Sequence, residues 1–471
     1  MHSELTRIRF PQSLFPALRR RLLADPTREA FAVLFAQRHS IAGATIYRVV
    51  DVHYPQASDY GSRGQAHLRI HRTYILERLA ELQHRGDVDT LMDVHTHPFS
   101  PSGASFSAVD DRDEKTFAEW LSATVEELHY ASIVLSHSDY AARVWGTPDG
   151  VATPRHAQIR AQIIAEDWPD AVAANRGKDG PTETALSNGP MSRNLPVVGL
   201  EVLRRIMSDQ TITVVGVGGL GSIIAENLIH SGFRSLNLID HDRVEVTNLN
   251  RLVGAYYGDA LQERLKVDVV REHLQRINPN ADVAAYPFTV ESPQATLPLM
   301  QADWIILATD NHGSRFFTQL KALELGIPML SAGVNITVAG GRVLDESGEI
   351  VIARYGDNLC LNCLRRINPL LVSTEGSVDP LLFAGLSKRG YVTGATVHEP
   401  AVKTLNAIVA AQAVNAVINQ YTERQPHAAI LVYENNTQST FYQDHDSVRD
   451  RLAPCAFCTR DTRPTSPRFA A

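Results

Sequence analysis

The first third of the chain alternates short apolar runs with one amphipathic segment. Residues 29–37 (EAFAVLFAQ), 90–97 (TLMDVHTH) and 130–138 (YASIVLSHS) are apolar runs of strand length. Residues 73–85 (TYILERLAELQHR) instead repeat apolar positions at the spacing of one helix face. This mixture predicts a compact α/β domain over residues 1–160.

The pattern changes in the middle of the chain. Residues 173–194 are rich in Gly, Pro, Ser and Asn, which is typical of a linker. After them, residues 211–240 show an apolar strand, a glycine-rich turn, an apolar helix and a second strand, the opening of a doubly wound sheet. The expected parts are therefore a linker over 161–194, a second α/β domain over 195–460 and a flexible tail over 461–471.

Composition narrows the class of protein. The net charge of −7 on 471 residues leaves no basic stripe for nucleic acid. The N-terminus lacks a signal-peptide core, and no run reaches the roughly 18 apolar residues of a membrane span. The longest candidate, 404–420, is interrupted by Asn406, Gln412 and Asn415 and predicts a buried amphipathic helix. We expect a cytoplasmic protein with neither nucleic acid nor membrane as partner.

All four cysteines occur in two C-x-x-C pairs. Cys360 and Cys363 form CLNC, and Cys455 and Cys458 form CAFC. In a cytosolic chain this pattern favours one structural zinc site with four thiolates over disulfides. Two unrelated redox or buried pairs are the alternative.

A second candidate metal site lies in DVHTHPFSPSGASFSAVDD, residues 93–111. Alternation along a strand points His95 and His97 to the same face, where two imidazoles can share one ion. Ser107 and Asp110 add an S-x-x-D, which also matches an ordinary helix capping box. Two nitrogens and a carboxylate are the ligands of a catalytic zinc with one position open for water. The alternative is two strand-end histidines before a capped helix.

A catalytic zinc site needs a base. Glu29 stands at the start of the apolar run 29–37 and is the candidate, although an exposed glutamate at a strand edge gives the same pattern.

Together these residues resemble the JAMM (MPN or JAB) metallopeptidases, which cleave bonds after the C-terminal glycine of ubiquitin-like proteins. The resemblance covers about 150 residues. It implies that His95, His97 and Asp110 bind zinc, that Glu29 is the general base and that Ser107 holds the oxyanion. The chain departs from the common pattern, because the gap before Ser107 is two residues longer and small alanines replace the usual glycines at two positions.

The second half carries a glycine loop, GVGGLG, between a strand and a helix. Gly216, Gly218, Gly219 and Gly221 let the backbone approach phosphates at a helix N-terminus. This loop alone is equally compatible with NAD or FAD in an oxidoreductase.

Further polar residues decide between these classes. Asp240 ends the next strand, where an acid can bind ribose. Arg251, Lys266 and Asp310 follow. Hydride transfer does not require an arginine, a lysine and a magnesium-type aspartate at the phosphates, whereas adenylation requires all three.

This order of motifs resembles the ubiquitin-activating-enzyme superfamily, especially its ThiF and MoeB branches, over roughly 187–460. The resemblance implies a Rossmann-like adenylation domain with ATP, Mg²⁺ and a structural zinc. In it the glycine loop binds nucleotide, Asp240 holds the ribose, and Asp310 holds Mg²⁺. The residues implied at the phosphates are Asn248, Arg251 and Lys266.

Arg193 matches an arginine that dimers of this superfamily insert into the partner's ATP site, so the resemblance implies a homodimer. Surface salt bridging is the alternative for Arg193, and a solvated helix face is the alternative for Lys266. Leu252 replaces the usual glutamine after the arginine. The segment 370–400 lacks the cysteine on which many members carry a thioester.

The two resemblances together imply a bifunctional enzyme for a ubiquitin-like protein with a C-terminal glycine. One half adenylates the glycine and the other cleaves after it. The fusion resembles those of bacterial ubiquitin-like conjugation pathways linked to antiphage defence, which implies a conjugating-enzyme homologue as partner. Two rivals remain: activation of a sulfur-carrier protein with an external sulfur donor, and a scaffold with one silent site.

Overall fold

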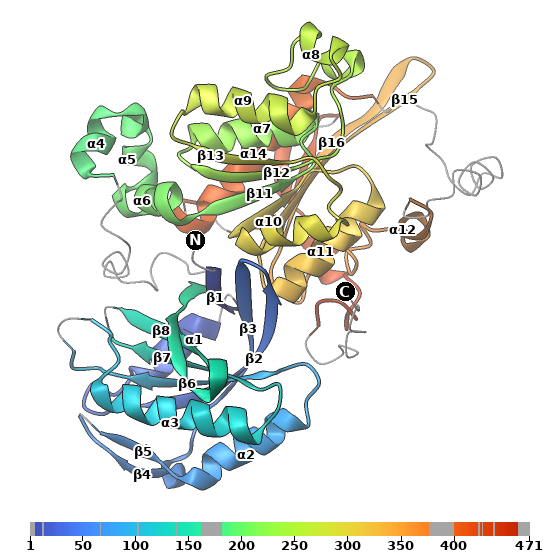
Figure 1. The fold of residues 1–471 in the computed structure, drawn as a ribbon. Coiled ribbons are helices and arrows are strands. Elements are labelled where there is room, and N and C mark those ends of the chain that lie inside the picture. Colours follow the sequence, from blue (N-terminus) through green and yellow to red (C-terminus); the bar gives the residue numbers. More distant parts are fainter. Residues whose placement is uncertain are drawn as a thin grey trace. The chain divides into compact units, whose positions relative to one another are not determined.

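A computed structural model describes residues 5–11, 14–65, 67–100, 103–137, 139–161, 181–375, 400–422, 424–425, 427–436 and 439–459. The chain divides into two compact units near residue 180, and each is described by itself (Figure 1). The predicted tail over 461–471 and most of the segment 370–400 lie outside the described residues.

The first unit is built on an eight-stranded mixed sheet with the order β10-β1-β3-β2-β6-β7-β8-β9. The strands are β1 (Leu5–Phe10), β2 (Phe31–Ile41), β3 (Ala44–His53), β6 (Thr90–Thr96), β7 (His129–Leu135), β8 (Tyr140–Gly146), β9 (Thr153–His156) and β10 (Gln158–Ala161). A separate hairpin and three helices complete the unit: β4 (Tyr60–Arg63), β5 (Leu68–Ile70), α1 (Leu14–Leu22), α2 (Arg72–Gln83) and α3 (Ala108–Thr124).

Strand β2 shows why this sheet is covered on both faces. Leu34 belongs to a core that includes Phe15 and Leu18 of α1. Its neighbour Phe35 belongs to a second core with residues of α2 and α3. Because side chains alternate along a strand, a continuous apolar run such as β2 requires an apolar layer on each side.

The second unit is a doubly wound sheet with the order β13-β12-β11-β14-β15-β16-β17-β18. Its first five strands are parallel and the last three pairings are antiparallel. The strands are β11 (Thr211–Val215), β12 (Ser235–Ile239), β13 (Asp282–Tyr286), β14 (Trp304–Leu307), β15 (Met329–Ala339), β16 (Arg342–Ala353), β17 (Ile430–Glu434) and β18 (Thr440–Gln443).

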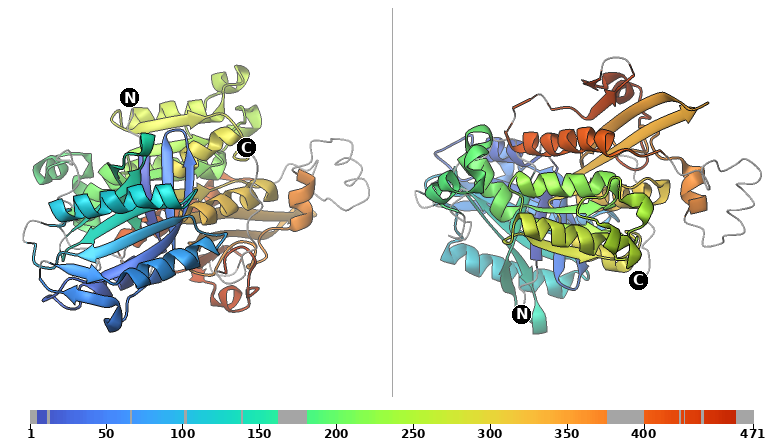
Figure 2. Two further views of the ribbon diagram at one scale, coloured as in Figure 1. Left: turned by 60° about the horizontal axis from the view of Figure 1, so that its bottom comes forward. Right: turned by 90° about the horizontal axis from the view of Figure 1, so that it is seen from above.

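Helices cover this sheet on both faces. α7 and α14 lie side by side on one face, with α9 next to them (Figure 2, right). α10 and α11 lie on the other side of the sheet (Figure 1). The helices are α6 (Leu200–Asp209), α7 (Gly219–His230), α8 (Tyr257–Leu261), α9 (Lys266–Ile277), α10 (Thr296–Gln301), α11 (His312–Leu325), α12 (Pro369–Glu375), α14 (Lys403–Thr422) and α15 (His445–Arg449).

Helix α14 is buried as expected for residues 404–420. Asn406 and Asn419 are buried along with most of its apolar residues, while Ile408 is exposed. No described helix of the chain has the length and apolarity to cross a membrane.

The described part of the predicted linker is helical. It contains α4 (Glu183–Asn188) and a 3-10 turn η5 (Pro190–Arg193), and α5 (Leu195–Val198) follows directly after it. Leu186 is buried in a small cluster with Leu203 and Met207 of α6. Part of the polar composition that suggests a linker serves to start a helix, since Thr182 accepts a hydrogen bond from the Ala185 amide as the N-cap of α4. Composition alone is therefore a poor guide to this stretch.

Candidate functional sites

Two histidines and one aspartate converge in the first unit. His95 lies near the end of β6, His97 follows that strand, and Asp110 lies in the first turn of α3. Nε2 of His95 lies 3.4 Å from Oδ1 of Asp110, and Nε2 of His97 lies 3.8 Å from Oδ2. One donor atom from each residue fits within a sphere of metal-ligand size. The geometry therefore suits a divalent ion with one position left open.

The S-x-x-D motif serves as a helix cap as well. Ser107 is the N-cap of α3, and its Oγ accepts a hydrogen bond from the Asp110 amide at 3.3 Å. The Ser107 amide donates to Oδ2 of Asp110 at 2.6 Å. The two interpretations of this motif are therefore compatible, because the cap fixes the carboxylate that faces the histidines.

The carboxylates of Asp110 and Asp93 favour a positive charge at His95. Burial lowers the pKa of His95, but Asp110 and Asp93 outweigh burial and raise it to about 10. Hydrogen bonds and the charge of His95 outweigh burial at Asp110 and hold its pKa well below its usual range. Burial and His95 lower the pKa of His97. A divalent cation can take the place of the proton that this cluster attracts, which is the behaviour expected of a metal site.

Glu29 is buried, unlike an ordinary glutamate at a strand edge. It lies two residues before β2, and its amide donates to the carbonyl of Gly64 at 2.9 Å. Burial raises the pKa of its carboxyl, while His95 lowers it and Asp110 raises it. The amide of the next residue, Ala30, donates to Oγ1 of Thr96 at 2.8 Å, so the segment that carries Glu29 lies against the end of β6, where His95 and His97 flank Thr96.

Sequence reasoning missed a second set of polar residues behind the cluster. Asp93 and Glu114 offer carboxylates near His95, and Arg143 donates to Glu114 at 2.9 Å. Asp93 precedes His95 by two residues on β6, so strand alternation alone could have placed them on one face. Glu114 and Arg143 carry no such signal, because they come from α3 and β8.

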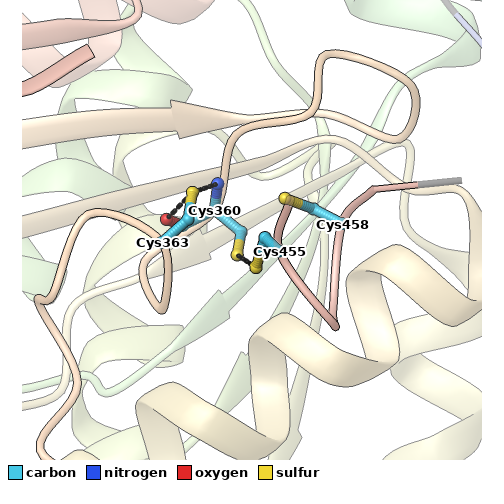
Figure 3. A group of neighbouring side chains, drawn as sticks. All are labelled: Cys360, Cys363, Cys455 and Cys458. Atoms are coloured by element: carbon cyan, nitrogen blue, oxygen red, sulfur yellow. Dashed lines mark hydrogen bonds between the residues drawn. The ribbon is translucent and has the colours of Figure 1, made fainter. Parts of the chain in front are cut away.

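The four cysteines gather in the second unit (Figure 3). All four are buried and unoxidised, and Sγ of Cys360 lies 3.8 Å from Sγ of Cys455. That separation is well beyond the roughly 2 Å of a disulfide bond. The Cys363 thiol accepts a hydrogen bond from the Cys360 amide at 3.1 Å, as in a turn that presents both sulfurs to one point. Four converging thiols fit a structural zinc.

The glycine loop joins β11 to α7. Gly216 has φ of +86°, a conformation that disfavours other residues. A methyl group on Gly221 would lie 1.9 Å from the carbonyl oxygen of Gly216. A methyl group on Gly218 would meet no atom within 4 Å. The loop is thus closely packed at its base and open at Gly218, where a ligand can approach the backbone.

Two charged residues border this loop. Asp240, directly after β12, accepts a hydrogen bond from the Val217 amide at 2.7 Å. Burial raises the pKa of the Asp240 carboxyl, and the charge of Lys266 offsets this effect only in part. Lys266 is the first residue of α9, and its Nζ lies 2.7 Å from Oδ2 of Asp242. Lys266 is therefore paired and mostly covered, unlike a lysine on a solvated helix face.

The other residues predicted at the nucleotide site are Arg251, Asn248 and Asp310, and they differ in their contacts with the glycine loop. A methyl group on Gly219 would lie 2.7 Å from Cδ of Arg251, so this arginine packs against the loop. Asn248 ends the short turn η6 (Val246–Asn248) and accepts from the Glu245 amide at 3.2 Å. Asp310 is exposed, three residues after β14.

Arg193 is exposed at the end of η5. Among the residues that the structure describes, no hydrogen bond or ion pair joins it to the glycine loop of its own chain.

Fold and sites together define a two-part protein: an α/β unit with a candidate metal centre, followed by a doubly wound α/β unit with a glycine loop and a four-thiol cluster. The model of the ThiF family matches residues 191–455, more than half of the chain, and the chain belongs to that family. The model described as prokaryotic homologs of the JAB domain matches residues 11–145. The expected combination of a JAB/MPN domain with a Rossmann-like ThiF/MoeB-type domain is confirmed.

Individual relatives are similar over part of their length. The chain is 24% identical over 261 residues to ubiquitin-like modifier-activating enzyme 5 of Caenorhabditis briggsae, covering 52% of this chain and 57% of the relative. It is 34% identical over 140 residues to the sulfur carrier protein adenylyltransferase of Thermus thermophilus, covering 30% and 51%. The chain thus spans about half the length of these curated relatives.

Among solved structures, the crystal structure of E. coli MccB with MccA-N7isoASN has a TM-score of 0.45 and 16% identity, and the match covers 57% of this chain and 75% of that one.

Proposed function

We propose that this protein activates a ubiquitin-like protein at its C-terminal glycine and also cleaves bonds after that glycine. The observation that carries the proposal is the pairing of two sites in one chain: a ThiF-family glycine loop bordered by Asp240 and Lys266, and the His95–His97–Asp110 cluster beside buried Glu29. Both chemistries require access to the same narrow glycine tail, which favours their fusion.

In the adenylation reaction, the glycine carboxylate attacks the α-phosphorus of ATP, and pyrophosphate leaves as the acyl-adenylate forms. Gly218 leaves room for the nucleotide at the N-terminus of α7, where backbone amides favour anions. Asp240 would hold the ribose, and Lys266, Arg251 and Asn248 would hold the phosphates. Asp310 would hold Mg²⁺, which neutralises phosphate charge.

In the cleavage reaction, Glu29 removes a proton from the attacking water and delivers it to the leaving amine. Its raised pKa suits both steps, since a carboxyl that is too acidic is a poor base. Ser107 is exposed beside Asp110 and can donate to the oxyanion. Zinc held by His95, His97 and Asp110 would acidify that water and polarise the scissile carbonyl.

The acceptor of the adenylate is proposed to be an external thiol. All four cysteines of the chain belong to the buried cluster, and metal-bound thiolates are poor carriers. A conjugating-enzyme homologue in a bacterial antiphage-type pathway is the acceptor we favour. The second candidate function, activation of a sulfur carrier for a sulfur donor, is supported by the 34% identity to the Thermus thermophilus enzyme.

The test uses the full chain, ATP and a candidate modifier ending in glycine. Asp310→Asn should abolish ATP–pyrophosphate exchange and leave cleavage of a modifier fusion intact. Glu29→Gln should do the reverse while zinc stays bound, and His97→Ala should lose cleavage and zinc together. Loss of both activities in either single-site variant, with the fold intact, would contradict two independent sites.

A further inference from the structure

Nδ1 of His95 faces a carboxylate that the proposed zinc set does not use. Oδ1 of Asp93 lies 3.9 Å from Nδ1 of His95, whereas Nε2 of the same ring points to Asp110. Both residues belong to β6, and their spacing of two puts them on one face of the strand. The ring thus lies between two carboxylates, one on each nitrogen.

A tyrosine of the neighbouring strand holds Asp93 in this position. Tyr130 of β7 donates a hydrogen bond from its hydroxyl to Oδ2 of Asp93. Oδ1 of Asp93 is buried and has no hydrogen-bond partner among the described residues. A buried carboxylate oxygen without a partner is costly, so a donor is expected to meet it. The 3.9 Å gap is too long for a hydrogen bond, but a small rotation of the ring closes it.

His97 has a different arrangement. Its Nε2 lies 3.8 Å from Oδ2 of Asp110. The two imidazoles therefore differ: His95 has a carboxylate near each ring nitrogen, whereas the only ion pair of His97 among the described residues is with Asp110.

Glu114 is the competing acceptor. Its carboxylate lies in the same group as Asp93 and His95. However, Oε2 already accepts from Ser132, from Arg143 Nε at 2.9 Å and from Trp145 Nε1 at 3.0 Å. Glu114 thereby ties α3, which carries Asp110, to strands β7 and β8. Its other oxygen, Oε1, is buried and has no hydrogen-bond partner among the described residues either. Asp93 is nevertheless the nearer acceptor, since its Oδ1 lies 3.9 Å from Nδ1 of His95, whereas no ion pair joins His95 to Glu114 among the described residues.

We propose that Asp93 is the positioning residue of the metal site: it accepts the Nδ1–H of His95 and so leaves the Nε2 lone pair directed at the ion. The proposal rests on the proposed zinc function of His95, His97 and Asp110. Partners of this kind fix the tautomer and orientation of a ligand, and their loss typically weakens metal binding about 10- to 100-fold. Tyr130 supports the arrangement through Asp93.

The test compares Asp93→Asn with Asp89→Asn, a control that removes a carboxylate directly before the same strand. Asp89 accepts from the Arg38 amide at 2.8 Å and lies outside the cluster. Zinc-loaded full-length protein is mixed with a chromogenic chelator, and the release of zinc is followed over time. A mercurial reagent added afterwards releases the zinc of the four thiolates, which serves as an internal reference.

Asp93→Asn should speed zinc release or raise the dissociation constant about 10- to 100-fold, with thiol-bound zinc unchanged. Tyr130→Phe, which leaves both carboxylates in place, should have a smaller effect in the same direction and decides the matter should Asp93→Asn fail to fold. Release from both variants at the Asp89→Asn rate would overturn the inference. A wild-type chain without chelator-releasable zinc would instead overturn the proposed metal site itself.

Discussion

The carboxylate of Asp240 is hydrogen-bonded to the glycine loop: its Oδ2 lies 2.7 Å from the backbone nitrogen of Val217. Its other oxygen accepts from the Asp242 amide at 2.9 Å. The residue proposed to hold the ribose therefore also fixes the loop that is proposed to hold the phosphates. Because of this double role, Asp240→Ala and Asp240→Asn should differ in their effects on stability and on ATP binding.

Asp240→Ala removes both acceptors and leaves the amide of buried Val217 and that of exposed Asp242 without this partner. We expect the free energy of unfolding of the second unit to fall by about 1–3 kcal/mol and ATP binding to weaken strongly. Asp240→Asn keeps one carbonyl acceptor and should be intermediate in stability. Thermal unfolding and nucleotide titration measure the two effects. An alanine variant as stable as the wild type would contradict the structural role.

Gly221→Ala and Gly218→Ala form a matched pair in the same loop. The methyl group at position 221 would lie 1.9 Å from the Gly216 carbonyl oxygen, so the loop must shift and the unit should lose stability. The methyl group at 218 meets no protein atom within 4 Å, so stability should be unchanged while ATP binding weakens. Equal ATP affinity in Gly218→Ala and the wild type would show that nucleotide does not approach the loop there.

Arg193→Ala tests whether the ATP site is completed by a second copy of the chain. Because Arg193 is exposed and has no bond to its own glycine loop among the described residues, its proposed role requires a two-fold dimer. The variant should exchange ATP and pyrophosphate slowly. Mixing it with Asp310→Asn should restore part of the activity, since the mixed dimer keeps one complete site. A monomer in light scattering at micromolar concentration would rule out this role.

Incubation of the protein with ATP, Mg²⁺ and its modifier should give no thioester on this chain. The four cysteines form one buried cluster, so none is available as a carrier. A non-reducing gel reports the result, and rapid ATP–pyrophosphate exchange in the same sample shows that activation took place. An adduct that is sensitive to reducing agent and lost in one Cys→Ala variant would free that cysteine from the zinc site.

Much of the architecture was predictable from periodicity. The strands at 29–37, 90–97 and 130–138 appear as β2, β6 and β7, and the helix at 73–85 appears as α2, with ends shifted by a few residues. The strand–loop–helix–strand over 211–240 appears as β11, α7 and β12. The strands are buried over most of their length, and α2 buries one face through Tyr74, Leu79 and Leu82, so each segment carries a regular apolar pattern.

The predicted linker shows where local patterns are insufficient. Residues 183–188 form a helix because Leu186 has Leu203 and Met207 to pack against. Its polar composition carries no sign of that cluster, since the partners lie more than ten residues further along the chain.

The sequence by itself determined the chemical groups of both sites, because H-x-H, S-x-x-D, the glycine loop and the C-x-x-C pairs are local spacings imposed by a strand, a helix turn or a tight loop. Only the tertiary structure decided which groups meet. It brings Cys360 and Cys455 together across 95 positions and sets Glu114 and Arg143 behind His95. Such contacts depend on how helices and strands pack, and packing is a property of the whole fold rather than of any short segment.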